Sequence, residues 1–219
     1  MNIRRYPLVC GVLAAALALG GCSSDDSTPS SSSGSDAPSE SGDTPAEATE
    51  TSASIIVTGE ALPARSFQGE EQTPPSGLAP TIGGVGFDGS PVTITPGANG
   101  KPMAVIFVAH WCPHCQKEVP LLAQLLKTNT SISGVEVAFV STSVRPEADN
   151  YPPSEWLKPE WISTPVLADD AKSTAAAAYG VGGYPFLVFL DSEGKVTGRF
   201  SGEMGLEDLA ARFKKAAGA

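Results

Sequence analysis

Two cysteines at the junction of a predicted strand and a predicted helix constrain the fold of this chain more than any other feature of its sequence. The run from Met103 to Ala109 is apolar, rich in strand formers and too short for an amphipathic helix, which is typical of a buried strand. After the cysteines, apolar residues recur at helical spacing from Gln116 to Lys127. Cys112 and Cys115 therefore lie where the chain leaves a strand and enters a helix.

The residues at this junction predict different roles for the two thiols. Pro113 is expected at the first helical position, which proline favours because its missing N–H would have no partner there. Cys112 then lies near the N-cap, where the free N–H groups of the first turn and the helix dipole stabilise a thiolate. We expect Cys112 to be the nucleophile and Cys115, one turn later and more buried, to resolve the mixed disulfide.

The segment Trp111-Cys112-Pro113-His114-Cys115, placed between a strand and a helix, resembles the active-site motif of the thioredoxin superfamily. Lys117-Glu118-Val119-Pro120 is similar to the run that follows the cysteines in membrane-anchored TlpA-like thioredoxins. Tyr184-Pro185, before an apolar run, resembles the cis-proline segment that faces the cysteines in this family. The resemblance implies that Trp111, Pro113, His114, Tyr184 and Pro185 support the two catalytic cysteines.

The same resemblance, which runs from about Leu78 to the C-terminus, implies an α/β, thioredoxin-like fold. Its central mixed sheet would be flanked by helices and preceded by an N-terminal hairpin extension. The sequence pattern places the elements as follows: a short strand at 54–58, a hairpin at 83–95 turning at Asp88-Gly89, a second buried strand at 135–141 parallel to the buried strand at 103–109, a helix at 171–179 stopped by Gly180, antiparallel strands at 186–190 and 195–200, and a last helix with Leu206, Leu209 and Phe213 on its apolar face.

Residues 1–21 have the features of a targeting segment. Arg4 and Arg5 give a positive start, and the apolar stretch from Leu8 to Leu19 is too short to span a membrane. Leu19-Gly20-Gly21-Cys22 resembles a bacterial lipobox, which implies cleavage before Cys22 and a lipid on that cysteine. The alternative is an ordinary signal peptide followed by an unrelated cysteine.

Residues 22–52 are expected to form a disordered acidic tether, and residues 53–219 a thioredoxin-like domain. From residue 23 to residue 52 the chain consists mainly of Ser, Asp, Glu, Pro, Thr and Ala, with seven acids and no base. Such a composition lacks the large apolar residues that a core requires. The predicted location is therefore extracytoplasmic, with the domain held at the bacterial cell membrane by the lipid anchor.

The use of cysteine favours redox chemistry over metal binding. With one cysteine lost in the signal segment and Cys22 assigned to lipid, only Cys112 and Cys115 remain, so no structural disulfide is expected. A closed zinc site takes four Cys or His ligands. The two histidines of the chain, His110 and His114, are both crowded around the cysteines, which makes a metal site the weaker interpretation. No cofactor is expected.

The predicted partners are envelope proteins that carry thiols or disulfides, together with a membrane redox partner. Nucleic acid is excluded by the formal net charge of −10, because such binding needs a basic patch. A different class of function also stays open, a non-catalytic binding lipoprotein that keeps the thioredoxin fold for docking.

The direction of electron flow is left open by the sequence. Pro113-His114 is the pair found between the cysteines of DsbA-like oxidants, where a histidine stabilises the thiolate, whereas the TlpA-like frame implies a reductant, for example of apocytochrome c. The bland alternative for His114 is a solvated residue at the helix start. Tyr184 matches neither the Thr common in reductants nor the Val of DsbA-like proteins, so substrate choice is not implied.

Proton transfer and one inserted segment complete the expectations. Thioredoxin-like reductants carry a buried acid six positions before the first cysteine, where this chain has Ile106. Glu118 is a candidate for that role, although we expect it on the surface of its helix. The family resemblance implies an inserted helical segment at 150–165, a stretch that is rich in proline. Its aromatic residues either line a substrate groove or, as we expect, pack the insertion onto the body: Tyr151, Trp156 and Trp161.

Overall fold

The computed structural model describes residues 48–64, 66, 68–128, 132, 134–158, 164 and 166–218. All of them belong to one unit, Thr44–Ala219. The expected signal segment, Cys22 and the tether up to residue 47 lie outside the described residues and stay predictions.

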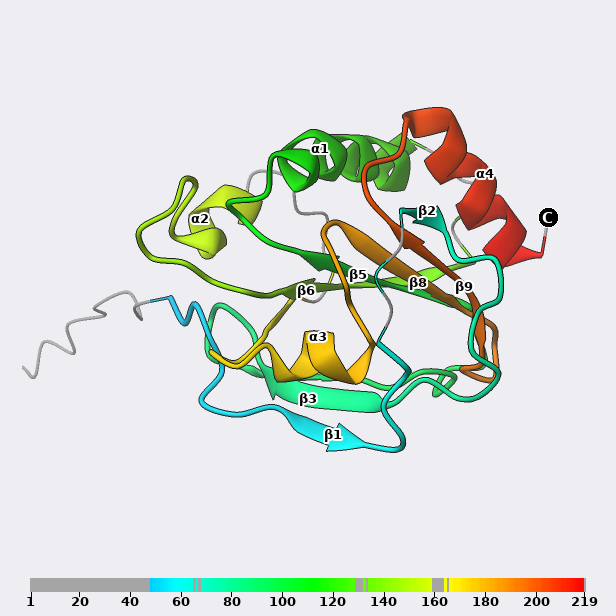
Figure 1. The fold of residues 1–219 in the computed structure, drawn as a ribbon, viewed down its shortest axis with the longest axis horizontal. Coiled ribbons are helices and arrows are strands. Elements are labelled where there is room, and N and C mark those ends of the chain that lie inside the picture. Colours follow the sequence, from blue (N-terminus) through cyan, green and yellow to red (C-terminus); the bar gives the residue numbers. More distant parts are fainter. Residues whose placement is uncertain are drawn as a thin grey trace, which may run out of the picture. The chain divides into compact units, whose positions relative to one another are not determined.

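A mixed sheet forms the centre of this unit (Figure 1). The strand order is β1-β3-β7-β6-β5-β8-β9-β2, with β4 paired to β3. The central strand β5 is parallel to β6, as expected, and antiparallel to β8. The strands are β1 (Ile56–Thr58), β2 (Gly69–Glu70), β3 (Thr81–Val85), β4 (Pro91–Ile94), β5 (Met103–Val108), β6 (Glu136–Ser141), β7 (Val166–Ala168), β8 (Phe186–Leu190) and β9 (Val196–Ser201).

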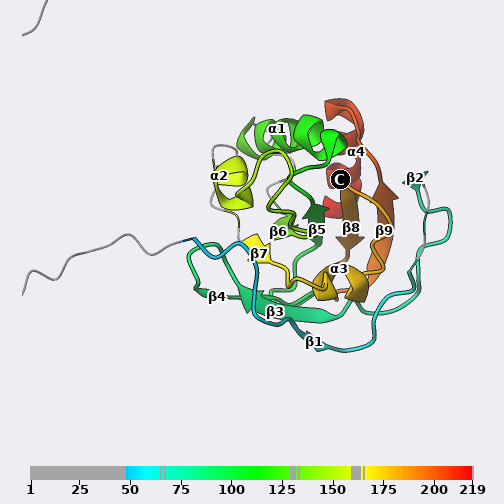
Figure 2. The same cartoon turned by 60° about the vertical axis from the view of Figure 1, so that its left-hand side comes forward.

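Helices cover the central strands on both faces, as Figures 1 and 2 show. They are α1 (Pro113–Thr128), α2 (Pro153–Leu157), α3 (Thr174–Ala178) and α4 (Leu206–Ala217). On one face lie α1, α2 and α4, and on the other lies α3, with β3 and β1 beyond it. The expected mixed sheet with flanking helices, including the hairpin of β3 and β4, is confirmed.

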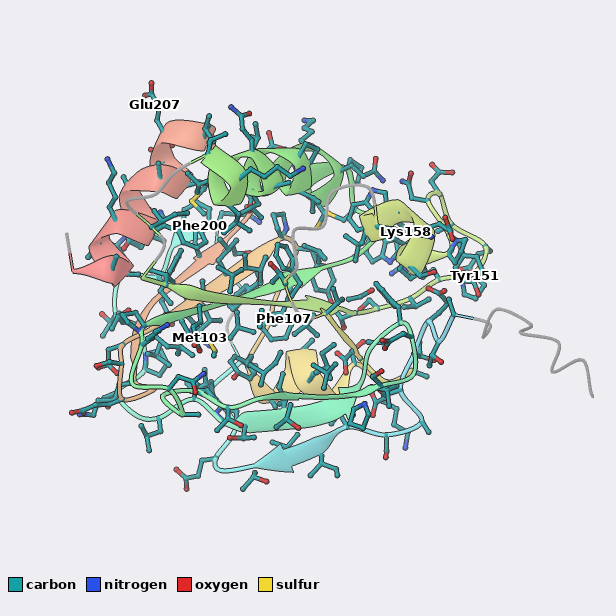
Figure 3. The ribbon with its side chains drawn as sticks, turned by 180° about the vertical axis from the view of Figure 1, so that it is seen from behind. Met103, Phe107, Tyr151, Lys158, Phe200 and Glu207 are labelled. Carbon is teal, nitrogen blue, oxygen red and sulfur yellow. The ribbon has the colours of Figure 1, made fainter. Side chains whose placement is uncertain are left out.

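Strand β5 separates two hydrophobic cores because its successive side chains point to opposite faces. Val105 and Phe107 belong to the core that contains α3, and Ile106 and Val108 belong to the core under α1 and α4. Figure 3 labels Phe107 between the central strands and α3, where its ring lies 5.2 Å from that of Tyr179. All six residues of β5 are buried, which explains why the strand is apolar throughout.

The structure differs from the sequence expectations at α3, which begins at Thr174 rather than near residue 171. The side chain of Asp170 accepts hydrogen bonds from the N–H groups of Lys172 and Thr174, and Asp169 accepts those of Ala175 and Ala176. These bonds form a turn ahead of the helix, so regular structure starts later. The two short strands β2 and β7 were also not expected.

Residues just before the expected boundary at residue 53 already form hydrogen bonds with the domain. The backbone N–H of Thr49 donates to Phe87 O at 2.7 Å. Ser52 is 4% exposed, donates through Oγ to Ala168 O and accepts from the N–H of Val85. The composition of this stretch is unsuited to a core, but single polar residues still supply partners for backbone groups of the domain.

The inserted segment after residue 150 contains α2, as expected for a helical insertion. Trp156 packs against the core under α1 and α4, which confirms the packing interpretation for this residue. Tyr151 is exposed and lies at the periphery beside α2 (Figure 3). Trp161 lies outside the described residues.

Within the described residues, no helix combines the length and hydrophobicity needed to cross a membrane.

Candidate active site

Both cysteines of the motif are free thiols at the start of α1. Cys112 follows the end of β5 and immediately precedes Pro113, the first residue of the helix, as expected. Its carbonyl accepts the first helical hydrogen bond, from the N–H of Gln116 at 3.1 Å. Cys112 is 6% exposed and Cys115 is fully buried, so the expected order of burial holds although Cys112 is less open than expected.

The surroundings shift the pKa values of the two thiols in opposite directions. A hydrogen bond from the Cys115 thiol, the backbone N–H groups of Cys115 and His114, and the charge of His114 together lower the pKa of Cys112 to about 6. Burial, together with the neighbouring Cys112, raises the pKa of Cys115 far above its usual range. Near neutral pH, Cys112 is therefore mainly a thiolate and Cys115 a thiol.

The segment before β8 faces the cysteines, as the sequence predicted. The Tyr184-Pro185 peptide bond is cis. Pairing of β8 with β5 brings this segment beside the end of β5, and the Tyr184 carbonyl oxygen lies 3.5 Å from Cys112 Sγ as its hydrogen-bond acceptor.

A loop after β6 fixes the two aromatic residues beside Cys112. The indole Nε1–H of Trp111 donates to the carbonyl of Ser143 at 2.7 Å. The side-chain oxygen of Ser143 lies 2.7 Å from the Tyr184 hydroxyl, and the two rings meet edge to face at 6.1 Å. Ser143 adopts a φ of 52°, which is uncommon for a residue other than glycine. Nothing in the sequence around Ser143 indicated this role.

His114 is exposed but not without a partner. Its Nδ1 lies 2.7 Å from Oε2 of Glu203, and Lys117 Nζ lies 3.4 Å from the same oxygen. The hydrogen bond from His114 lowers the pKa of Glu203. Glu203 lies between β9 and α4 and was not recognised from the sequence. His114 is therefore a solvated residue at the helix start, as in the bland interpretation, and it has a carboxylate partner in addition.

The other histidine, His110, is fully buried and is used by the backbone on both ring nitrogens. Nδ1 lies 2.7 Å from the carbonyl of Asp149, so it carries the proton and donates it. Nε2 accepts a hydrogen bond from the N–H of Arg145 at 3.1 Å. His110 therefore attaches the loop after β6 to the strand end that leads into the cysteines.

Glu118 is buried, so its expected position on the helix surface is wrong. It is 0% exposed, because the chain before α4 covers this side of α1, and its Oε2 accepts the N–H of Met204 at 2.5 Å. Its Oε1 is also buried and has no hydrogen-bond partner among the described residues. Burial raises the pKa of Glu118 to about 8. Since residues three apart share a helix face, Glu118 lies on the same side of α1 as Cys115.

The comparisons with known proteins agree with this geometry. The family model named Redoxin matches residues 59–214. Nucleoredoxin of Homo sapiens is 31% identical over 101 residues, which cover 46% of this chain and 22% of its own length. Thiol-disulfide oxidoreductase ResA of Bacillus anthracis is 27% identical over 116 residues, which cover 53% of this chain and 64% of ResA.

Among solved structures, a thiol:disulfide interchange protein of the thioredoxin family from Chlorobium tepidum is similar at 27% identity and a TM-score of 0.52. The match covers 66% of this chain and 98% of that one, and it identifies the mixed sheet with flanking helices as a thioredoxin-like fold. The chain spans less than a quarter of the human nucleoredoxin that it matches. Because the family model spans most of this chain and includes both cysteines of the motif, the chain belongs to the Redoxin family.

Proposed function

We propose that the protein is a thiol–disulfide oxidoreductase that exchanges disulfides with proteins of the cell envelope through Cys112 and Cys115. The observation that carries this proposal is the difference between the two thiols. Cys112 has a pKa of about 6 at the start of a helix, and Cys115 is fully buried with a raised pKa. A thiolate beside a protonated thiol is the pair that disulfide exchange requires.

The reaction proceeds in two exchange steps when the substrate is a disulfide. The thiolate of Cys112 attacks one substrate sulfur, the substrate S–S bond breaks, and the other sulfur leaves as a thiolate. Cys115 then loses its proton and attacks the Cys112 sulfur of the mixed disulfide. The second substrate thiolate leaves, and the two electrons of the dithiol have passed to the substrate. The reverse sequence oxidises a substrate dithiol.

Glu118 supports the second step as the group that exchanges a proton with Cys115. It lies one turn further along the same face of α1, and its Oε1 is buried without a partner among the described residues. With a pKa of about 8, its carboxyl is available in both protonation states near neutral pH. Ile106 occupies the position where thioredoxin-like reductants carry a buried acid, and it is fully buried.

The reduction potential of the pair decides the direction of flow. A pKa of about 6 for Cys112 lies between those of the reactive cysteines of thioredoxin, about 7, and DsbA, about 3.5. Equilibration with glutathione measures the potential directly. A value near about −120 mV assigns an oxidant, and a value near about −270 mV assigns a reductant of envelope disulfides.

Export and lipid anchoring at Cys22 belong to the same proposal. They rest on the positive start, the short apolar stretch and the lipobox-like Leu19–Cys22 of the sequence. The name of the relative ResA describes a thiol-disulfide oxidoreductase, which supports the exchange chemistry. A membrane redox partner would return the pair to its working state.

Substrate trapping tests the proposal. In cells, Cys115→Ala should accumulate mixed disulfides with partner proteins, because the resolving thiol is missing, whereas Cys112→Ala should not. The purified parent protein should catalyse reduction of insulin or oxidation of a dithiol peptide, and Cys112→Ala should be inactive in both assays. A parent protein that turns over neither substrate would instead support the non-catalytic binding lipoprotein.

A further inference from the structure

The loop from Ser143 to Asn150 is attached to the two residues that precede Cys112. Trp111 Nε1–H donates to the carbonyl of Ser143, and the buried ring of His110 bonds the backbone of Arg145 and Asp149. The side-chain amide of Asn150 donates to the carbonyl of His110 at 3.3 Å. These four hydrogen bonds hold the loop in one position relative to the reactive cysteine.

Within this loop, the side chain of Arg145 lies over the active-site tryptophan. Its guanidinium carbon is 3.7 Å from the centroid of the Trp111 ring, which is a cation–π contact. Arg145 itself is exposed. Stacking occupies the face of a guanidinium and leaves the N–H groups at its edge free to bond a planar anion.

Arg145 has no carboxylate partner among the described residues, and this distinguishes it from the other described arginines. Arg199 is paired with Glu71, and Arg212 with Glu70. This positive group is held in position beside Trp111, is open to solvent and has no carboxylate partner in the described part of the chain, so it is suited to binding an anion on the incoming substrate.

We propose that Arg145 is a specificity-determining residue, which pairs with an acidic side chain of the substrate polypeptide close to its reactive cysteine or disulfide. The inference rests on the proposed exchange function and adds a substrate class to it. Arginine and carboxylate form paired, parallel hydrogen bonds. Because the loop and the stacked ring already fix the guanidinium, little side-chain freedom remains to be lost on binding.

Peptide charge provides the test. The reduced full-length protein is mixed with peptides that contain one internal disulfide and differ only in two flanking residues, both Glu or both Lys. The ratio of the two second-order exchange rates should favour the Glu peptide. In Arg145→Glu this ratio should fall on the order of tenfold, because residue 145 would then repel the Glu peptide and attract the Lys peptide. A role limited to packing on Trp111 would slow both peptides alike and leave the ratio unchanged.

Two further variants complete the design. Lys101→Glu makes the same change of net charge at the opposite end of β5, and screening over a distance of about 8 Å should keep its ratio within about twofold of the parent. Arg145→Lys keeps the charge without the planar fork and should give an intermediate ratio.

An uncharged disulfide, bis(2-hydroxyethyl) disulfide, tests the exchange function separately from the charge preference assigned to Arg145. Suppose that the parent reacts with this compound, but that the ratio of Glu-peptide to Lys-peptide rates is the same for the Arg145→Glu protein as for the Lys101→Glu protein. The inference about Arg145 is then overturned, while the exchange function stands. If the parent reacts with none of the three disulfides, the exchange function fails and this inference fails with it.

Discussion

At the residue scale, the reactivity of Cys112 depends on the thiol of its neighbour. The largest contribution to the lowered pKa of Cys112 is the hydrogen bond from Cys115. Replacing Cys115 with Ala should therefore raise the pKa of Cys112 from about 6 toward the free-thiol value of about 8.5. Ultraviolet thiolate absorbance followed against pH measures this shift. Cys115→Ser is the matched control, because its hydroxyl still donates, so its shift should be smaller; equal shifts in both variants would contradict the assignment.

A second prediction at this scale concerns the proton of Cys115. Glu118→Gln cannot take up a proton, so resolution of the mixed disulfide should slow near neutral pH on the order of a hundredfold, a usual size for general-base catalysis. Attack by Cys112 on the first disulfide should be affected much less. Rapid-mixing experiments separate the two steps. If both steps slow to the same extent, Glu118 has a structural role rather than one in proton transfer.

The buried carboxyl of Glu118 also predicts a pH dependence of stability. Its pKa is about 8 in the folded protein, against about 4.3 in an unfolded chain. Because this pKa is raised on folding, the contribution of the protonated carboxyl to the free energy of unfolding is fully present below about pH 4.3. It is lost as the pH rises toward 8. Relative to Glu118→Gln, the parent should therefore be less stable at pH 8.5 than at pH 5, as measured by urea midpoints. The control Glu147→Gln, at an exposed position, should show no such change.

At the scale of elements, the sequence predicted those whose pattern is local and long. β5, α1 and α4 show apolar runs or helical spacing that single segments reveal, and their positions are confirmed. β7 has only three residues, and its place is determined by pairing with β6, which no local pattern specifies. The sequence pattern predicts a start of α3 near residue 171, but the side chains of Asp169 and Asp170 bond the backbone N–H groups there and delay the helix to Thr174.

In the active site too, the residues that lie in recognisable local segments were predictable, and those brought in from distant loops were not. The residues of the motif and Tyr184-Pro185 lie in short, recognisable segments. Ser143, Arg145 and Glu203 come from loops that only the topology brings to the cysteines. The burial of Glu118 is not predictable from its own helix, because the residue that covers it, Met204, is 86 residues further along the chain.

A buried ion pair joins β9 to the irregular chain around β2. Glu71 and Arg199 are 6% and 1% exposed, and their two contacts measure 2.7 and 2.9 Å. Glu71→Ala leaves a buried guanidinium without its carboxylate, which should cost about 3 to 5 kcal/mol of the free energy of unfolding. Urea denaturation measures this loss. The neighbouring Glu70 pairs with Arg212 on the surface, so Glu70→Ala should cost less than about 1 kcal/mol. Similar losses in both variants would contradict the distinction.

At the scale of the whole molecule, the domain is attached to its N-terminal extension at Thr49 and Ser52, through hydrogen bonds to Phe87, Val85 and Ala168. If residues 22–48 form the flexible tether that their composition predicts, their typical span is about 30 Å. Six acids and no base lie between residues 22 and 48, and their mutual repulsion would extend the tether. The proposed anchor would thus hold the active site close to a membrane while leaving it free to meet its substrates.

The anchor itself gives the last prediction. Cys22→Ser should prevent lipid attachment and release the protein from the membrane fraction, because a lipid on Cys22 is the proposed membrane attachment of the mature chain. Fractionation of cells measures the release from the membrane, and the mass of the N-terminal peptide measures the loss of the lipid. Cys10→Ser is the matched control: it lies within the predicted signal segment, so the mature protein should be unchanged. A Cys22→Ser protein that is processed and still fractionates with the membrane like the parent would show that the lipobox interpretation is wrong.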